Sequence, residues 1–360
     1  MTNFFSLIDN ESLQDWKNDS ETFNLSQKAW EALGGLKVIN TTFIQEIPEI
    51  NFFLQILKKS ESNFSTQIEG TQNELEEVIL EKKKNSKYGG KDLTETLNCI
   101  LALNLGIKRL KDLPLSIRLM KEIHYTLMQH ESKANPGEFR TVQNWIGSKD
   151  KKNARYVAPS IEKMQDLLGK LEKFMHNKTI DPLIKIAITH YEFEAIHPFI
   201  DGNGRLGRIM IDLQFLENDI LDRPLYLWSF FEKNVKSYEL NLAEVSKTKK
   251  FKGWIDFFLQ GIIETCKKRL LKIEKFLVLK KEYQQKTREI GKNSEKILSL
   301  LWEKAFINAK QVSEKLNISF STALVILKKM EETKILKTWD DKKRNRVYLC
   351  FEYIKLFREF

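Results

Sequence analysis

The segment His197-Pro-Phe-Ile-Asp-Gly-Asn-Gly-Arg-Leu-Gly-Arg208 holds the densest group of chemically capable residues in this 360-residue chain. Apolar residues recur with helical spacing from Leu183 to Ala195, and Pro198 stops that helix. A second helix is expected to begin near Arg205. The two glycines of the connecting loop permit a tight turn that presents backbone N–H groups at a helix N-terminus, where the helix dipole favours anions. The sequence therefore predicts a helix–loop–helix unit with a phosphate-binding loop.

Charged side chains surround this predicted loop. Arg205 and Arg208 are three residues apart and share one face of the first helical turn, where they would flank a bound phosphate. Asp201 adds a carboxylate, which suits a Mg²⁺ ion that bridges phosphates. His197 is the nearby group whose ordinary pKa suits a general base at neutral pH. Base, metal ligand and phosphate loop together predict attack of a hydroxyl on a nucleotide phosphate, although the P-loop pattern GxxxxGK[ST] is absent.

The rest of the chain is predicted to be mainly α-helical. Helical apolar spacing recurs in Leu97–Leu110, Ile117–Met128 and Ile161–Phe174, and only 15 glycines and 7 prolines interrupt the chain. Pro136–Pro159 differs, because strand-like residues flank a polar loop at Ser148–Asn153. We expect a short β-hairpin there and helices around it.

The twelve residues quoted above resemble the signature of the Fic family, HPFx[DE]GNGRxxR, at every specified position. The resemblance implies an all-helical core with a small hairpin called the flap. Most Fic proteins transfer AMP from ATP to a Ser, Thr or Tyr hydroxyl of a target protein. The resemblance also implies roles for individual residues: His197 as the base, Asp201 as the Mg²⁺ ligand, Gly202, Asn203 and Gly204 as the hole for the α-phosphate, Arg205 for the β-phosphate and Arg208 for the γ-phosphate.

Two further segments resemble parts of the same family. Ala154–Pro159 resembles the flap, so Tyr156 and Val157 are expected beside the target or the nucleoside. Asn234–Phe258 resembles the adenosine-side segment and contains Tyr238. This chain departs from the family there, with Glu239 where relatives often have Tyr and Ser246 where they often have Arg. A base other than adenine therefore stays open.

An inhibitory motif is indicated upstream, because Ser65-Thr-Gln-Ile-Glu-Gly70 resembles the family pattern [ST]xxxE[GN]. Glu69 would pair with Arg208 in a bidentate ion pair, in the place that the γ-phosphate needs. ATP would then bind only in an unproductive pose. In some relatives this glutamate also supports removal of AMP from the target, so the direction of the reaction stays open.

Residues 294–360 are predicted to form a winged helix-turn-helix. Helices are expected at Glu295–Lys304, Ala309–Leu316 and Phe320–Thr333, and strands at Ile335–Trp339 and Arg346–Phe351. The third helix and the wing would offer polar and basic side chains to DNA: Ser319, Ser321, Thr322, Lys328, Lys329, Lys342, Lys343, Arg344 and Arg346. A module for dimerisation or protein docking is the alternative.

The net charge of +10 belongs to the C-terminal part of the chain. From Lys267 onward there are 24 Lys and Arg against 12 Asp and Glu, whereas residues 1–266 hold 35 against 37. No stretch approaches the roughly 18 apolar residues of a membrane span, and the N-terminus lacks the pattern of an export signal. With three widely separated cysteines, the sequence favours a cytoplasmic protein.

We therefore expect four parts: an N-terminal helical region at 1–110 that carries the inhibitory motif at 65–70, a catalytic core at 111–262, a connector helix at 263–293 and the winged helix-turn-helix at 294–360. The predicted activity is self-inhibited transfer of AMP from ATP to a target protein or to the chain itself. The alternatives are AMP removal that uses Glu69, and a DNA-binding regulator that senses nucleotide. Homodimers are common among relatives and are expected here.

Overall fold

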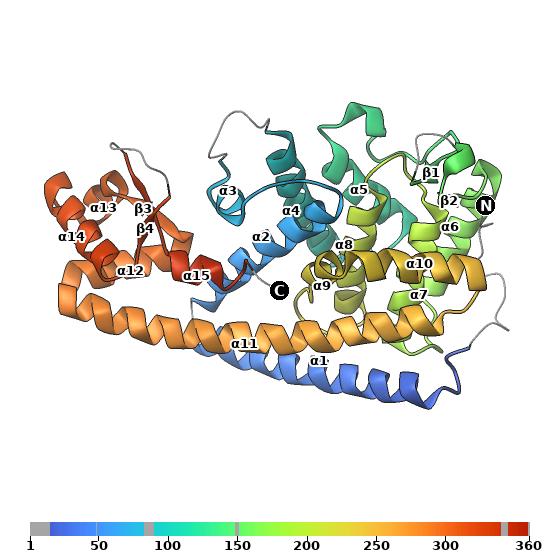
Figure 1. Cartoon of the computed structure of the whole chain (residues 1–360), viewed down its shortest axis with the longest axis horizontal. Coiled ribbons are helices and arrows are strands. Elements are labelled where there is room, and N and C mark those ends of the chain that lie inside the picture. Colours follow the sequence, from blue (N-terminus) through green and yellow to red (C-terminus); the bar gives the residue numbers. More distant parts are fainter. Residues whose placement is uncertain (1–14, 48, 83–89, 148–150, 340–344, 359–360) are drawn as a thin grey trace. The chain divides into compact units, whose positions relative to one another are not determined.

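The computed structural model describes residues 15–47, 49–82, 90–147, 151–339 and 345–358, and these ranges are mainly α-helical, as predicted (Figure 1). None of the helices in these ranges is both long and apolar enough to cross a membrane. The helices are α1 Ser20–Glu46, α2 Ile50–Ile68, α3 Leu75–Leu80, α4 Lys91–Arg109, α5 Ile117–Met128, α6 Ile161–Met175, α7 Pro182–Ile196, α8 Asn203–Glu217, α9 Trp228–Lys233, α10 Val235–Thr248, α11 Lys252–Ile290, α12 Lys292–Lys304, α13 Ala309–Leu316, α14 Phe320–Glu332 and α15 Phe351–Lys355. Two short 3₁₀ helices span Ser132–Ala134 and Lys151–Asn153. The strands are β1 Trp145–Ile146, β2 Tyr156–Val157, β3 Phe306–Asn308, β4 Lys337–Thr338 and β5 Val347–Leu349.

The chain divides into two compact units that do not follow the order of the sequence. The first contains residues 1–38, 64–72 and 94–267. The second contains residues 39–63, 73–93 and 268–360. Helices α1, α2, α4 and α11 therefore each have residues in both units. The four domain limits expected from the sequence stay a prediction.

Helix α7 forms the centre of the first unit and packs against α6 and α8 (Figure 1). The buried residues of α7 lie on almost all of its faces and are mostly apolar, which is the pattern of a fully buried helix. Its start is well defined, because the Asp181 side chain accepts hydrogen bonds from the backbone N–H groups of Leu183 and Ile184. Pro182 follows as the first helical residue, where its missing N–H costs nothing.

The turn from α7 to α8 passes through the left-handed region of backbone space. His197 ends α7 with φ of 50°, and Gly202 precedes α8 with φ of 79°. A side chain at position 202 would also meet the Met128 sulfur, because an added Cβ would lie 2.8 Å from it. Only glycine avoids both the backbone strain and this clash. The turn thus points the N-terminus of α8 back toward the end of α7.

The predicted hairpin is present in the first unit. Strands β1 and β2 pair antiparallel, with Trp145 opposite Val157 and Ile146 opposite Tyr156 (Figure 1). Part of the polar loop expected at Ser148–Asn153 lies outside the described residues. We refer to residues 142–159 as the flap.

The second unit contains the predicted winged helix-turn-helix fold. Helices α12, α13 and α14 accompany a three-stranded antiparallel sheet of order β3-β5-β4. Ser319 caps α14 by accepting a hydrogen bond from the Thr322 backbone N–H. Strand β3 was not predicted, because three residues are too few to produce a visible alternation. The wing residues Lys342, Lys343 and Arg344 lie outside the described residues, whereas Arg346 lies within them.

Aromatic side chains build the core of the second unit. Phe52 and Phe53 of α2 pack against Tyr353 and Phe357 near the C-terminus, with ring centroids 5.3 and 4.9 Å apart respectively. Trp302 of α12 adds an edge contact to Tyr353 at 5.5 Å. The first half of α2 is therefore an integral part of this unit.

Candidate active site

A cavity of about 470 Å³ in the first unit brings together several residues predicted from the sequence. The end of α2, the end of α7, the start of α8, the flap and α10 all contribute to its lining. The predicted residues that line it are Glu69, Tyr156, His197, Gly204, Arg208 and Tyr238. The predicted residues Ser65, Gly70, Val157, Asp201, Gly202, Asn203 and Arg205 are not among those that line it.

His197 lies at the cavity with a defined tautomer. Its Nδ1 atom is 3.2 Å from the carbonyl oxygen of Glu194, and because a carbonyl can only accept, Nδ1 carries the hydrogen. Burial lowers the pKa of His197 to about 4, although the carboxylates of Glu69 and Asp201 act in the opposite direction. At neutral pH the ring is therefore neutral, and Nε2 has a free lone pair that can take a proton.

The predicted phosphate-binding loop is held from within. The Asn203 side chain accepts a hydrogen bond from the Phe199 N–H and donates one to the Phe199 carbonyl, each at 2.9 Å. Asn203 thus fastens the loop with its side chain, and only its backbone is left for a ligand. Gly204 lies directly beneath the cavity, where an added Cβ would be 2.5 Å from the Glu69 carboxylate and 3.2 Å from the Arg208 guanidinium. A side chain at position 204 would therefore displace the Glu69 carboxylate from its present position.

Arg208 is engaged by the predicted inhibitory motif. Its Nη2 atom donates to Glu69 Oε1 at 2.7 Å and to the Ser65 carbonyl at 2.8 Å, and its Nε atom donates to Ser65 Oγ at 2.9 Å. The side chain of Arg208 is 1% exposed, whereas that of Glu69 is 37% exposed. The pair uses a single carboxylate oxygen, so the bidentate pair predicted from the sequence is wrong, and Ser65 accepts from Nε and also from Nη2. Gly70 follows with φ of 100°, which ends this segment.

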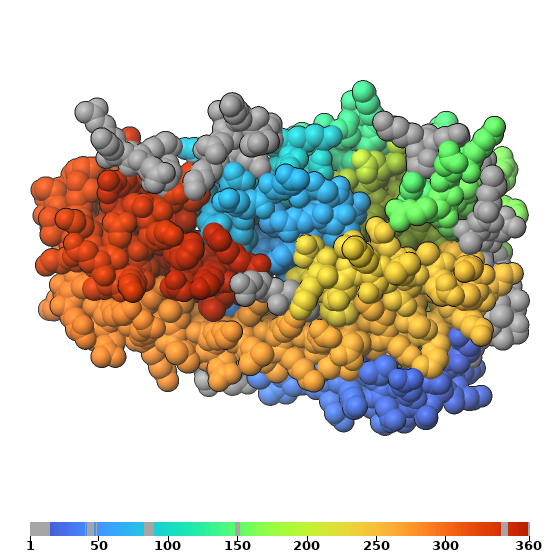
Figure 2. All heavy atoms as spheres, in the orientation of Figure 1, coloured from blue at the N-terminus to red at the C-terminus, as the bar shows by residue number. Residues whose placement is uncertain are grey.

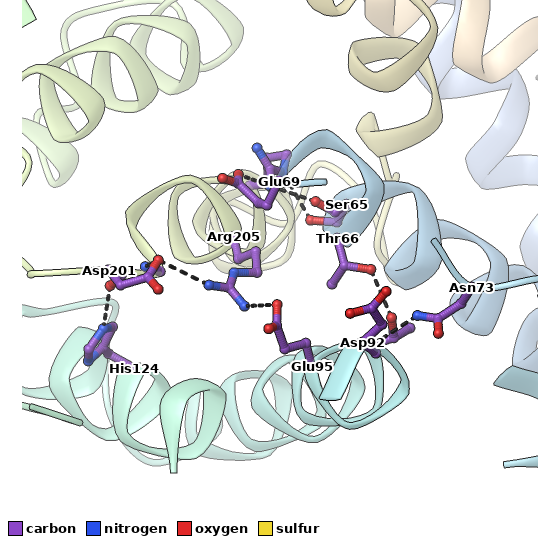
Figure 3. Close-up of polar contacts among 12 residues, drawn as sticks. Ser65, Thr66, Glu69, Asn73, Asp92, Glu95, His124, Asp201 and Arg205 are labelled. Atoms are coloured by element: carbon purple, nitrogen blue, oxygen red, sulfur yellow. Dashed lines mark hydrogen bonds and ion pairs between the residues drawn. The ribbon is translucent and has the colours of Figure 1, made fainter. Parts of the chain in front are cut away.

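Arg205 lies away from the cavity between two carboxylates (Figure 3). Its Nη1 atom is 3.0 Å from Glu95 Oε2, its Nη2 atom is 3.2 Å from Asp201 Oδ1, and its side chain is 4% exposed. Glu95 comes from α4, 110 residues earlier in the chain, and no local sequence signal identifies it. A bound phosphate would have to compete with these carboxylates for Arg205.

Asp201 fits a Mg²⁺ ion that arrives with phosphates. Its Oδ1 atom accepts hydrogen bonds from the Gly202 N–H and from Arg205, and more than half of the side chain is exposed. Mg²⁺ commonly uses one or two protein carboxylates and completes its shell with water and phosphate oxygens. No group of three His, Cys, Asp or Glu side chains arranged for a metal occurs among the described residues. The donor set therefore suits a metal carried by a nucleotide.

His124 is a site residue that the sequence did not indicate. Its Nε2 atom is 2.9 Å from the Asp201 carbonyl, and its Nδ1 atom accepts a hydrogen bond from the Gly137 N–H (Figure 3). The ring stacks on Phe199 with centroids 3.7 Å apart. Burial lowers the pKa of His124 to about 4, so the ring is neutral and Nε2 donates. His124 thus holds the loop that carries Asp201.

The other end of the cavity lies between the flap and α10. The Tyr238 hydroxyl is 2.7 Å from His190 Nε2, and the Tyr191 hydroxyl is 3.0 Å from Ser246 Oγ. Arg155 of the flap and Glu239 of α10 form an ion pair at 3.4 Å, and Figure 2 shows the green flap beside the yellow surface of α10. Glu239 and Ser246, which depart from the family pattern, therefore both line the cavity at this end.

Comparison with known families agrees with this geometry. Residues 114–215 match the Fic/DOC family, and residues 23–108 match the Fic/DOC family N-terminal region. The chain belongs to the Fic/DOC family. Residues 291–337 match the winged helix-turn-helix DNA-binding family.

Curated relatives of this Fic/DOC member include proteins named protein adenylyltransferase Fic. The one from Drosophila erecta is 28% identical over 202 residues, which are 52% of this chain and 38% of the relative. The one from Drosophila virilis is 28% identical over 182 residues, 47% of this chain and 36% of the relative. The chain thus spans less than two fifths of the length of these relatives.

Solved structures support the fold of this Fic/DOC member. A Fic family protein from Desulfovibrio desulfuricans G20 has a TM-score of 0.61 and 18% identity, over 93% of this chain and 97% of that one. Fic-1 from C. elegans has a TM-score of 0.52 and 17% identity, over 70% of this chain and 74% of that one. At these identities the similarity concerns the fold alone.

Glu194 adds a second carboxyl group beside Arg208 that sequence reasoning missed. It lies one helical turn before His197 and lines the cavity, and its Oε1 atom is buried without a hydrogen-bond partner among the described residues. An added Cβ at Gly207 would lie 2.5 Å from this oxygen. Burial raises the pKa of Glu194 to about 8, with a further increase from the charge of Glu69 and a decrease from Arg208.

Replacement of Glu194 by Gln is expected to stabilise the protein more at pH 8 than at pH 5. An unfolded chain loses the Glu194 proton near its ordinary value of 4.5, whereas the folded chain keeps it up to about pH 8. This group therefore lowers the stability progressively as the pH rises between those two values, and Gln removes that loss. Thermal unfolding of both proteins at the two pH values measures the effect.

The control is Glu162→Gln, which removes an exposed carboxylate at the start of α6. Its difference in Tm from the unmodified chain should be nearly the same at both pH values. A Glu194→Gln difference that is equally independent of pH would contradict the buried, protonated state of Glu194.

Proposed function

We propose that this chain is a protein adenylyltransferase, which transfers AMP from ATP to a Ser, Thr or Tyr hydroxyl of a target protein or of itself. The observation that supports this most is a neutral His197 in the same cavity as Gly204 and Arg208, at the N-terminus of α8. A proton acceptor therefore lies next to backbone N–H groups and a buried cation that suit a triphosphate. The relatives named protein adenylyltransferase Fic agree with this proposal.

The proposed reaction is a single displacement at the α-phosphorus of ATP. The target hydroxyl oxygen forms a bond to the α-phosphorus, and the bond from that phosphorus to the oxygen shared with the β-phosphate breaks. The hydroxyl proton goes to Nε2 of His197, and pyrophosphate leaves. Backbone N–H groups of Asn203 and Gly204 would stabilise the charge on the α-phosphate, and that of Gly202 would join them in exchange for its hydrogen bond to Asp201.

Charge on the leaving pyrophosphate would be balanced by the two arginines of α8. Arg208 would bind the γ-phosphate once Glu69 has left, and Arg205 would bind the β-phosphate in exchange for one of its carboxylates. A Mg²⁺ ion held by Asp201 would neutralise phosphate charge when it is bound. The residues of this chain would then hold the triphosphate in line with the attacking hydroxyl.

We further propose that Glu69 inhibits this transfer. Its carboxylate contacts Arg208 at 2.7 Å and lies above Gly204, so it adds a negative charge where the triphosphate has to bind. Arg208 is buried, which strengthens the pair relative to one at the surface. Ser65 uses two more contacts to hold Arg208 in the inhibited position.

Replacement of Glu69 by Gly is expected to increase AMP transfer, because Arg208 then becomes available to the nucleotide. The rise should be on the order of 10²-fold, as for the loss of one competing charged contact of a few kcal/mol. The purified chain is incubated with Mg²⁺ and α-labelled ATP, alone and with a cell lysate, and label on protein is measured.

Two variants control this assay. Glu162→Gly removes an exposed glutamate in α6 and should leave labelling at the level of the unmodified chain. Glu69→Gly combined with His197→Ala should abolish labelling, because the proton acceptor is lost. Absence of label from ATP and from the other three nucleoside triphosphates in Glu69→Gly would refute the proposed function.

Removal of AMP is the second candidate reaction, because Glu69 and His197 line the same cavity and Glu69 is partly exposed in it. If the chain also removes AMP, protein labelled by Glu69→Gly and then purified should lose its label when the unmodified chain is added. Glu69→Gln should be unable to remove the label. Label that persists with all variants would exclude this reaction.

The winged helix-turn-helix is proposed to bind DNA through α14, where Lys328 and Lys329 are exposed. The combined change Lys328→Ala and Lys329→Ala in the full chain should weaken binding to a random-sequence duplex. Loss of two phosphate contacts should reduce the slope of log K against log salt by about 2. Lys108→Ala, an exposed lysine of α4, is the control. No shift of DNA by the unmodified chain at low salt would favour protein docking instead.

The cytoplasmic location and the homodimer expected from the sequence also belong to this proposal. The location follows from the composition, and the homodimer follows from its frequent occurrence among relatives. Size-exclusion chromatography with light scattering measures the oligomeric state directly.

A further inference from the structure

Arg140 is a buried cation whose partners are backbone carbonyl groups. It is 1% exposed. Its Nε atom donates to the His197 carbonyl at 2.9 Å, Nη1 to the Val142 carbonyl at 3.1 Å and Nη2 to the Pro159 carbonyl at 2.6 Å. Within the described part of the chain, no carboxylate pairs with it. Because burying a charge without a counter-ion is costly, such a residue points to a requirement beyond stability.

The position of Arg140 explains how its charge is tolerated. Carbonyl groups at the end of a helix lack partners within the helix and carry partial negative charge. The His197 carbonyl at the end of α7 is one of them, and it also accepts a hydrogen bond from Asn144 at 3.4 Å. The backbone N–H of Arg140 donates to the next carbonyl, that of Pro198, at 2.9 Å. Arg140 thus caps the end of α7 with both its side chain and its backbone.

The same guanidinium also holds the flap. Val142 and Pro159 lie at the two ends of the flap, so Arg140 ties both ends to the end of α7. Two neighbouring contacts have the same effect. Asn144 donates to the Phe199 carbonyl at 3.1 Å, and the Tyr156 hydroxyl donates to the Ala195 carbonyl at 2.6 Å. The flap and the turn that bears His197 are therefore one hydrogen-bonded assembly with Arg140 at its centre.

His197 needs such support because of its backbone. A φ of 50° is unfavourable for a residue with a side chain, and it persists only where the surroundings enforce it. A change in this backbone angle would swing the imidazole out of the cavity. The carbonyl that Arg140 holds belongs to this residue itself.

We propose that Arg140 is a positioning residue, which fixes the imidazole of His197 relative to the flap and so places the proton acceptor beside the edge where a target segment would lie. This inference rests on the proposed transferase function. Arg140 does not line the cavity, so it acts through His197 and the flap without contact with the nucleotide.

The positive charge of Arg140 also affects the pKa of His197. The titratable and charged groups around His197 are Glu69 just after α2, Glu194 of α7, Arg208 of α8 and Asp201 of the loop, and the first three of these line the cavity. Burial is the main cause of the low pKa of His197, and the positive charge of Arg140 lowers this pKa further. Loss of that charge should raise the pKa of His197. A lysine at position 140 keeps a positive charge and should largely preserve this pKa.

The experiment uses the full chain with Glu69→Gly as the parent and adds Arg140→Met or Arg140→Lys. Met approximates the length of the side chain but has no charge. Lys keeps the charge but lacks the planar guanidinium group with its several N–H donors. Lys121→Met is the matched control, since it removes a partly exposed cation that pairs with Glu138 two residues before Arg140. Three quantities are measured: the labelling rate at saturating ATP, the ATP concentration for half the maximal rate, and the pKa of His197 by NMR of ¹³C-labelled histidine.

Arg140→Met is expected to lower the maximal rate about 100-fold, as for a catalytic group displaced by about 1 Å, with the half-saturating ATP concentration unchanged. The pKa of His197 should rise in Arg140→Met and stay near the parent value in Arg140→Lys, whose rate should be intermediate. Lys121→Met should match the parent in all three quantities.

Two results would overturn the inference. One is a maximal rate in Arg140→Met equal to that of the parent. The other is an equal loss of rate in Arg140→Met and Arg140→Lys with no change in the pKa of His197, which would mean that Arg140 only stabilises the fold. An inactive Glu69→Gly parent would refute the proposed function instead, and the NMR titration would still test the link between Arg140 and His197.

Discussion

Between Ile196 and Asn203 the chain reverses direction through two left-handed residues, His197 and Gly202, and the other parts of the site are fastened to this turn. Its geometry brings the carbonyl groups at the end of α7 and the N–H groups at the start of α8 to one place. Carbonyl groups of this turn accept hydrogen bonds from Arg140 and from Asn144 of the flap. The N–H groups at the start of α8 face the place proposed for an anion. The proposed proton acceptor and the proposed anion site therefore share one short segment.

Competition between carboxylates and phosphates is the second property that organises the site. Arg208 pairs with Glu69 and lies near Glu194, and Arg205 lies between Glu95 and Asp201. Each cation that suits a triphosphate thus already has an acidic partner. The nucleotide would have to replace these partners, so occupancy of the site depends on how firmly each carboxylate is held. The hydroxyl groups of Thr66 and Thr96 lie 2.8 Å apart and join α2, which precedes Glu69, to α4, which carries Glu95.

Local patterns explain why much of the fold was predictable. Helical periodicity identified α5, α7 and α14, and a polar loop between strand-like residues identified the hairpin. The proposed phosphate-binding loop could be predicted because its glycines, its arginines and His197 lie within twelve residues. By contrast, β3 has three residues and carries no readable pattern. Glu95, His124 and Arg140 have partners that are 110, 77 and 57 residues away respectively, so no local pattern indicates their contacts.

The sequence by itself determined which chemical groups are present and which short turns carry them, because glycine, proline and apolar spacing act on the nearest neighbours in the chain. The tertiary structure alone decided the protonation of these groups and their partners. Burial in the folded unit makes His197 neutral and keeps the proton on Glu194, and it places the Arg140 guanidinium on the His197 carbonyl. Burial depends on residues distant in the sequence, since a dry environment exists only when several helices pack around one point.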